Sequence, residues 1–289
     1  MLFALLAAVF MAIGIVVRQR ATMDVPPEHG VSMTLVTTLV RKRLWWIGTA
    51  VAVVGYACQA LALARGSLML VQPLLVSSLL FALPLSARLA GRRVTRGEWM
   101  WALLLTLGLA LFTLMARPST GEYRGQLAEW VVVAVVFVPL VAGCVLIGAR
   151  VHGRWRAALI AVAVGVLFGV VALLTKIVMH ALAEEGIMAF LRSPELYVLI
   201  VLGIAAVLLQ QSAFHAGALQ MSVPTMMVLE PVVAVLLGAF VLGEHLTVSG
   251  VATVVLPIAL VAMAAATIAL GRDEGAYEEQ LEAALVRRD

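Results

Sequence analysis

The sequence predicts an all-α polytopic membrane protein with about nine transmembrane helices in two inverted-topology repeats. The first observation behind this fold class is composition: of 289 residues, 63% are apolar and only 12% are charged. Soluble domains are about a quarter charged. The second is that apolar blocks of about twenty residues, the length that crosses a bilayer, recur between charged loops. The third is that two stretches of the chain resemble each other.

Nine apolar segments are expected to form membrane-spanning helices, because lipid satisfies no backbone polar group. They are residues 1–17, 44–64, 68–87, 99–116, 130–149, 157–180, 196–216, 222–243 and 248–270. Arg18 and Arg20 follow the first segment rather than precede it, so we expect a retained helix and not a signal peptide. The chain then divides into a first half (1–116), a second half (117–271) and a polar tail (272–289).

The distribution of basic residues predicts the orientation in the membrane. Twelve Lys and Arg residues follow the first, third and fifth segments, and only four lie in the intervening loops. Basic loops stay on the cytoplasmic side. The sequence therefore predicts a multi-pass protein of the plasma membrane with its N-terminus outside and its C-terminal tail in the cytoplasm.

One acid lies well inside an apolar segment. Glu230 is near the middle of residues 222–243 and is followed by Pro231. A carboxylate at that depth costs at least about 2.5 kcal/mol on insertion scales, and proline removes a backbone donor. Proton or cation coupling, or contact with a cationic substrate, is one interpretation. The alternative is a structural acid that hydrogen-bonds freed backbone or a neighbouring helix.

The internal similarity joins residues 59–114 to residues 211–265. Each stretch has a Gln near a helix end, a tight turn and an apolar helix expected to break at a polar-Pro pair. The pairs are Gln72-Pro73 and Glu230-Pro231. The two helices are predicted to cross the membrane in opposite directions, which is typical of the inverted repeats of transporters.

The segments QALALARGSLMLVQPLL (59–75) and VLEPVVAVLLGAFVLGEHLT (228–247) resemble the drug/metabolite transporter superfamily, in its EamA-like and NIPA-like branch. Gly243-Glu244 closes a helix in the second segment. The resemblance covers about residues 1–270. It implies a secondary transporter with a cavity between two halves. Members usually have ten spans, and this chain lacks one in its first half.

Further polar residues are candidates for substrate or coupling-ion binding. Lys176 either extends to the membrane interface or faces the cavity, paired with Glu230. Gln72 is at the place equivalent to Glu230, and otherwise satisfies backbone freed by Pro73. Gln211 is more typical of hydrogen bonds between helices. Thr225 could supply an oxygen ligand or simply pack between helices.

These observations favour a secondary transporter that moves a small solute by alternating access. A magnesium carrier of the NIPA type is a second hypothesis, with Glu230, Gln72, Thr225 and Ser77 as ligands. A non-transporting membrane subunit is a third. No nucleotide-binding loop, zinc motif or catalytic constellation is present, so we expect no enzyme, no cofactor and no resident metal. The expected partners are the bilayer and a small-molecule or cation substrate, without nucleic acid; a homodimer is left open.

Overall fold

The computed structural model describes residues 1–23, 42–89, 93–118, 127–215, 219–247 and 250–286. These residues are almost entirely helical, with one isolated bridge between Pro118 and Leu246. The helices are α1 (Leu2–Met23), α3 (Arg43–Arg65), α4 (Leu68–Leu75), α5 (Ser78–Leu89), α6 (Arg96–Met115), α7 (Leu127–Gly148), α8 (Arg154–Glu184), α9 (Ile187–Arg192), α10 (Pro194–His215), α11 (Leu219–Val241) and α12 (Ala252–Val286).

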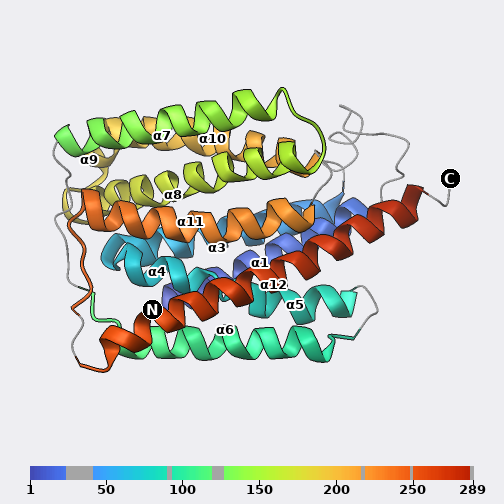
Figure 1. Ribbon diagram of the computed structural model, residues 1–289. Helices are drawn as coiled ribbons and strands as arrows, with labels where there is room; N and C mark the ends of the chain where they lie inside the picture. Colours follow the sequence, from blue (N-terminus) through green and yellow to red (C-terminus); the bar gives the residue numbers. More distant parts are fainter. Residues whose placement is uncertain (24–41, 90–92, 119–126, 216–218, 248–249, 287–289) are drawn as a thin grey trace.

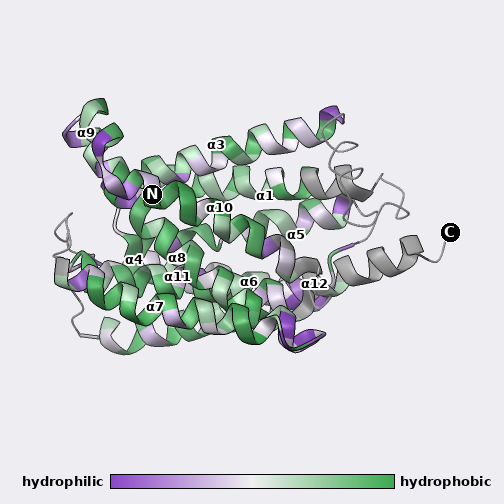
Figure 2. Ribbon diagram, turned by 90° about the horizontal axis from the view of Figure 1, so that it is seen from above, coloured by the Kyte–Doolittle hydropathy of each residue, from purple (hydrophilic) through white to green (hydrophobic). Residues whose placement is uncertain are grey.

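Seven helical stretches in the described residues are long and apolar enough to cross a membrane. The α4–α5 pair counts as one of them, and α3, α6, α7, α8, α11 and α12 are the others. Two further apolar stretches, Leu2–Val17 of α1 and Pro194–Gln210 of α10, are shorter. Apolar residues run along the helices, and hydrophilic residues gather near their ends (Figure 2). The chain is therefore a multi-pass membrane protein.

Helix α8 is the most deeply buried of the membrane-spanning stretches that the structure describes. It packs against α7, α10, α11 and α3, while α11 also contacts α12 and α4 (Figure 1). Small residues allow this close approach, because Gly165 and Gly169 of α8 lie directly against Leu229 and Val233 of α11. The residue numbers of α8 and of α11 increase in the same direction along this contact, so the two helices run parallel. This GxxxG pair is a helix–helix contact, as is common in membranes.

The two ends of the bundle differ in chemistry. One end holds the connections from α3 to α4 and from α11 to α12, and we call it the Glu244 end (Figure 1). The other end holds the connections from α5 to α6 and from α7 to α8. The basic residues predicted to be cytoplasmic lie at this second end where they are described, as Arg88, Arg96 and Arg154 show.

The structure corrects one predicted helix break. The first break is present: Pro73 lies inside α4, which ends at Leu75, and α5 begins at Ser78. The second is absent, because α11 runs unbroken through Pro224 and Pro231. A membrane helix tolerates proline where neighbouring helices support the freed backbone, and the backbone of Glu230 lies against Gly165 of α8.

Two other elements differ from the sequence prediction. The connection after α8 contains a short helix, α9, where only a loop was expected. Helix α12 continues without interruption from its apolar part into the tail and projects beyond its neighbours (Figure 1). The expected boundary at residue 272 is therefore a change in polarity and not a change in secondary structure.

The tight α8–α11 contact gives a test of the fold. In Gly169→Ala the new Cβ would lie 2.6 Å from Cγ1 of Val233 and 3.1 Å from the backbone nitrogen of Ala234. Such overpacking destabilises by about 1–3 kcal/mol, so thermal unfolding in detergent should shift to lower temperature. Gly203→Ala on α10 is the matched control, because nothing lies within 4 Å of its new Cβ. Equal unfolding temperatures for the two variants would contradict this packing.

Candidate functional site

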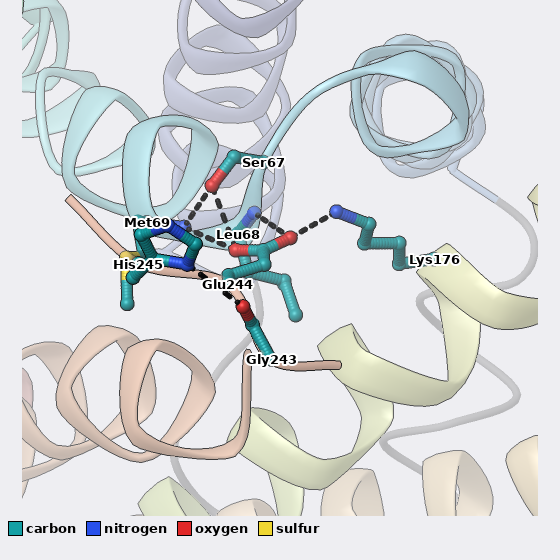
Figure 3. Close-up of polar contacts among 7 residues, drawn as sticks. All are labelled: Ser67, Leu68, Met69, Lys176, Gly243, Glu244 and His245. Carbon is teal, nitrogen blue, oxygen red and sulfur yellow. Dashed lines mark hydrogen bonds and ion pairs between the residues drawn. The ribbon is translucent and has the colours of Figure 1, made fainter. Parts of the chain in front are cut away.

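The most deeply buried charges described in the structure form an ion pair between α8 and the segment after α11. The ammonium group of Lys176 contacts Oε1 of Glu244 (Figure 3). The two residues are only 3% and 2% exposed. A buried charge is costly unless it is paired and hydrogen-bonded. The pair therefore explains how both side chains remain inside an apolar bundle.

The carboxylate of Glu244 also receives hydrogen bonds from the first turn of α4. The Ser67 hydroxyl donates to Oε2 at 2.7 Å. The backbone N–H groups of Leu68 and Met69 donate to Oε1 at 3.2 Å and to Oε2 at 3.3 Å (Figure 3). The first N–H groups of a helix have no partner within the helix and favour an anion. Glu244 thus occupies an anion site at the N-terminus of α4.

Ser67 has two roles in this cluster. It is the N-cap residue of α4, and its Oγ accepts a hydrogen bond from the Met69 N–H at 3.1 Å. The hydroxyl hydrogen of Ser67 is donated to the Glu244 carboxylate. The sequence favours this local structure, because serine is a preferred N-cap residue. The α4 N-terminus is therefore stabilised by a residue of its own and by a residue from the other half of the chain.

Two glycines bring Glu244 to this position. Gly243 has φ +62° and allows the chain to turn after α11. Gly238 lies under the carboxylate: a Cβ there would lie 3.0 Å from Glu244 Oε2 and 3.1 Å from Leu68 Cβ. The backbone N–H of Glu244 donates to the Gly238 carbonyl at 3.0 Å. Residues 238–244 therefore hold the carboxylate against the first turn of α4.

The observed ion pair differs from the Lys176–Glu230 pair that the sequence suggested. Lys176 is buried and contacts Glu244, so it neither extends to the interface nor pairs with Glu230. Glu230 lies beside Gly165 on α8. Lys176 is eleven residues further along this helix, roughly 16 Å at 1.5 Å per residue. The parallel register of α8 and α11 places Lys176 near the end of α11 rather than near its middle.

Gln72 is 1% exposed, and its Nε2 group has no hydrogen-bond partner among the residues that the structure describes. It lies one turn into α4 from Leu68 and therefore on the same side of the helix as that residue. A buried donor without a partner costs free energy, about 1–3 kcal/mol. Gln72 is thus placed one turn below the Glu244 site with an unused donor.

The remaining candidates are not gathered with this cluster. Glu230 is partly exposed on α11. The Thr225 hydroxyl donates to the Met221 carbonyl of its own helix at 2.6 Å, and the Ser77 hydroxyl donates to the Leu74 carbonyl at 2.6 Å. The side chain of Gln211 lies outside the described part of the chain. Among the described residues, no group of three or more His, Cys, Asp and Glu side chains could hold a metal ion.

Glu244 is the functional candidate that sequence reasoning missed. A residue directly after an apolar helix is ordinarily solvated, so its position gave no reason to expect burial. A usable signal was the Gly243-Glu244 pair itself, because a glycine that ends a helix can turn the next side chain inward. The donors come from Ser67 and Lys176, which are 177 and 68 positions away in the sequence.

The fold and this cluster define a helical, multi-pass membrane protein with a buried ion pair at one end of its bundle. No family model matches the chain, and no solved structure matches it. The chain is similar to an uncharacterized protein of Corynebacterium glutamicum, with 37% identity over 271 residues that cover 94% of each chain. It belongs to the same family as this protein.

A double-mutant cycle tests the ion pair. Lys176→Met or Glu244→Gln alone leaves the partner's charge buried, which typically costs about 3–5 kcal/mol. The double variant should lose less stability than the two single losses added together, because no unpaired charge remains. Thermal unfolding in one detergent measures all four proteins. Glu184→Gln, at the exposed end of α8, is the control for removing a charge, and strictly additive losses would show that the pair is not coupled.

Proposed function

We propose that the protein is a secondary transporter that moves a small solute by alternating access. The observation that carries this proposal is the buried Lys176–Glu244 cluster, because ionisable residues inside a membrane protein are functional-site candidates by default. The cluster joins the two halves of the chain. Ser67 to Met69 belong to the first half, and Lys176 and Glu244 belong to the second.

The helix packing supports two related halves. In the first half α1 packs against α3 and α5, and α4 contacts α6. In the second half α8 packs against α10 and α11, and α11 contacts α12. These pairings correspond if α1, α3, α4–α5 and α6 are equivalent to α8, α10, α11 and α12. Helix α7 then has no counterpart, as expected if the first half lacks one span.

The direction of the corresponding helices supports an inverted repeat. Helix α4 begins at the Glu244 end, whereas α11 finishes there (Figure 1). The two halves contact each other where α6 packs against α12 and where α4 packs against α11. We call this contact region the seam. Halves of opposite orientation that rock against each other are the basis of alternating access in transporters of this kind. We therefore extend the resemblance to the drug/metabolite superfamily into a proposal of function.

We further propose the plasma membrane as the location, with the Glu244 end outside and the tail in the cytoplasm. Support comes from the positively charged residues at the opposite end of the bundle. Glu230 is the proposed coupling or binding acid. It lies about 12 Å further into the bundle than Gly238, since eight residues of α11 separate them. Gln72 is the proposed neutral donor on the facing half.

Transport by reconstituted vesicles tests this function. Proton-linked and magnesium-linked flux should be measured for the wild-type protein, Glu230→Gln and the control Glu184→Gln, which lies at the exposed end of α8. We expect flux in the wild type and the control. Glu230→Gln should insert normally but lose at least about tenfold in flux, because a coupling acid acts through its charge.

The outcomes of this assay separate the alternatives. Magnesium uptake without proton dependence would favour a divalent-cation carrier. Normal flux in Glu230→Gln would remove this acid from the mechanism. A folded wild type without flux of any solute in a broad panel would favour a non-transporting membrane subunit.

A further inference from the structure

The segment that carries Glu244 has the features of a movable closure. Helix α11 ends at Val241, and Gly243 turns the chain at φ +62°. Residues 243–247 then cross the Glu244 end of the bundle as non-helical chain. We call these residues the 243–247 strap. Its second end is held by the segment that directly follows α6, where Leu246 bridges Pro118 and the Thr247 N–H donates to the Arg117 carbonyl at 2.9 Å.

One side chain of the strap differs from its neighbours. Gly243 and His245 are exposed, whereas Glu244 between them is 2% exposed. Its carboxylate points inward to Lys176 and the first turn of α4 (Figure 3). The strap therefore lies at the surface of the Glu244 end and inserts a single charged side chain between the two halves.

The contact across the seam is polar, and this suits an interaction that must form and break. Apolar packing beside it involves Leu68 of α4 and Gly238 of α11. A buried ion pair gains little net stability, because desolvation offsets attraction. Near the end of the bundle, both Lys176 and Glu244 can regain water when they separate. Such a contact can change between a paired state and a separated, hydrated state at a small cost in free energy, unlike a packed apolar core.

We propose that the 243–247 strap is a latch that closes the Glu244 end, with the Glu244 carboxylate seated in the anion site of Ser67, Leu68, Met69 and Lys176. The described structure is the state in which this end is closed. Release of the carboxylate separates α4 from the end of α11 and opens the seam. Its role as a gate in transport rests on the proposed function, but the closure itself does not.

The anion site predicts an asymmetry that an ordinary ion pair lacks. In a charge swap, Lys176→Glu with Glu244→Lys, the two charges still attract each other. However, the ammonium group at position 244 would face the N–H groups of Leu68 and Met69, which are donors and repel it. The swap should therefore leave the latch open, although a simple pair would be restored.

Chemical labelling of a buried thiol tests the latch. Cys58 and Cys144 are first replaced by Ala, and Val71→Cys is added, because Val71 is 4% exposed and lies one turn below Leu68. In lipid nanodiscs, a bulky maleimide should label the thiol introduced at position 71 slowly. Glu244→Gln should raise the rate at least about tenfold, because labelling follows the population of the open state.

A second variant opens the latch without changing a charge. Gly238→Ala places a Cβ 3.0 Å from Glu244 Oε2 and should also raise labelling. Gly203→Ala, which meets nothing within 4 Å, is the matched control. Size-exclusion profiles and circular dichroism identify the variants that fold. The swap is expected to label as fast as Glu244→Gln.

The results decide the proposal independently of transport. Faster labelling in Glu244→Gln, in Gly238→Ala and in the swap supports the latch, even if no flux is found in vesicles. Wild-type labelling rates in folded Glu244→Gln and Gly238→Ala would overturn it, even if the protein transports. Slow labelling in the swap would also overturn it, since that result indicates a simple ion pair.

Discussion

A carboxylate inside an apolar bundle must be met by donors, and this requirement organises the Glu244 end of the protein. Lys176 supplies a charge from α8, and Ser67, Leu68 and Met69 supply a hydroxyl and two N–H groups from α4. These groups belong to both halves of the chain. Because all of them converge on the same carboxylate, their positions depend on one another.

Close packing of α8 against α11 positions Lys176 and Glu244 for their contact. Gly165 and Gly169 bring α8 and α11 together in parallel, which places Lys176 near the end of α11. Gly238 then leaves room for the carboxylate beside Leu68. Membrane helices gain little from hydrophobic association, so small residues and polar contacts determine how they pack. The ion pair and the glycine contacts are thus parts of one helix arrangement.

The acid at the centre of α11 and the acid after it have different surroundings. Glu230 lies on a continuous helix against Gly165, about two turns below Gly238. Glu244 is held in place by four donors at the bundle end. Gln72, with its unused donor, lies on α4 one turn from Leu68. Glu230 and Gln72 are therefore separate from the hydrogen-bonded cluster around Glu244.

The sequence by itself determined the multi-pass membrane class and the helical architecture, because hydrophobicity and length are local properties of a segment. It also singled out Lys176, Gln72 and Glu230 as polar residues at membrane depth. Only the tertiary structure decided that Lys176 pairs with Glu244, that α11 passes Pro231 without a break, and that the α4 N-terminus is an anion site. These features depend on helix register and on contacts between residues up to 177 positions apart, which no local pattern of residues encodes.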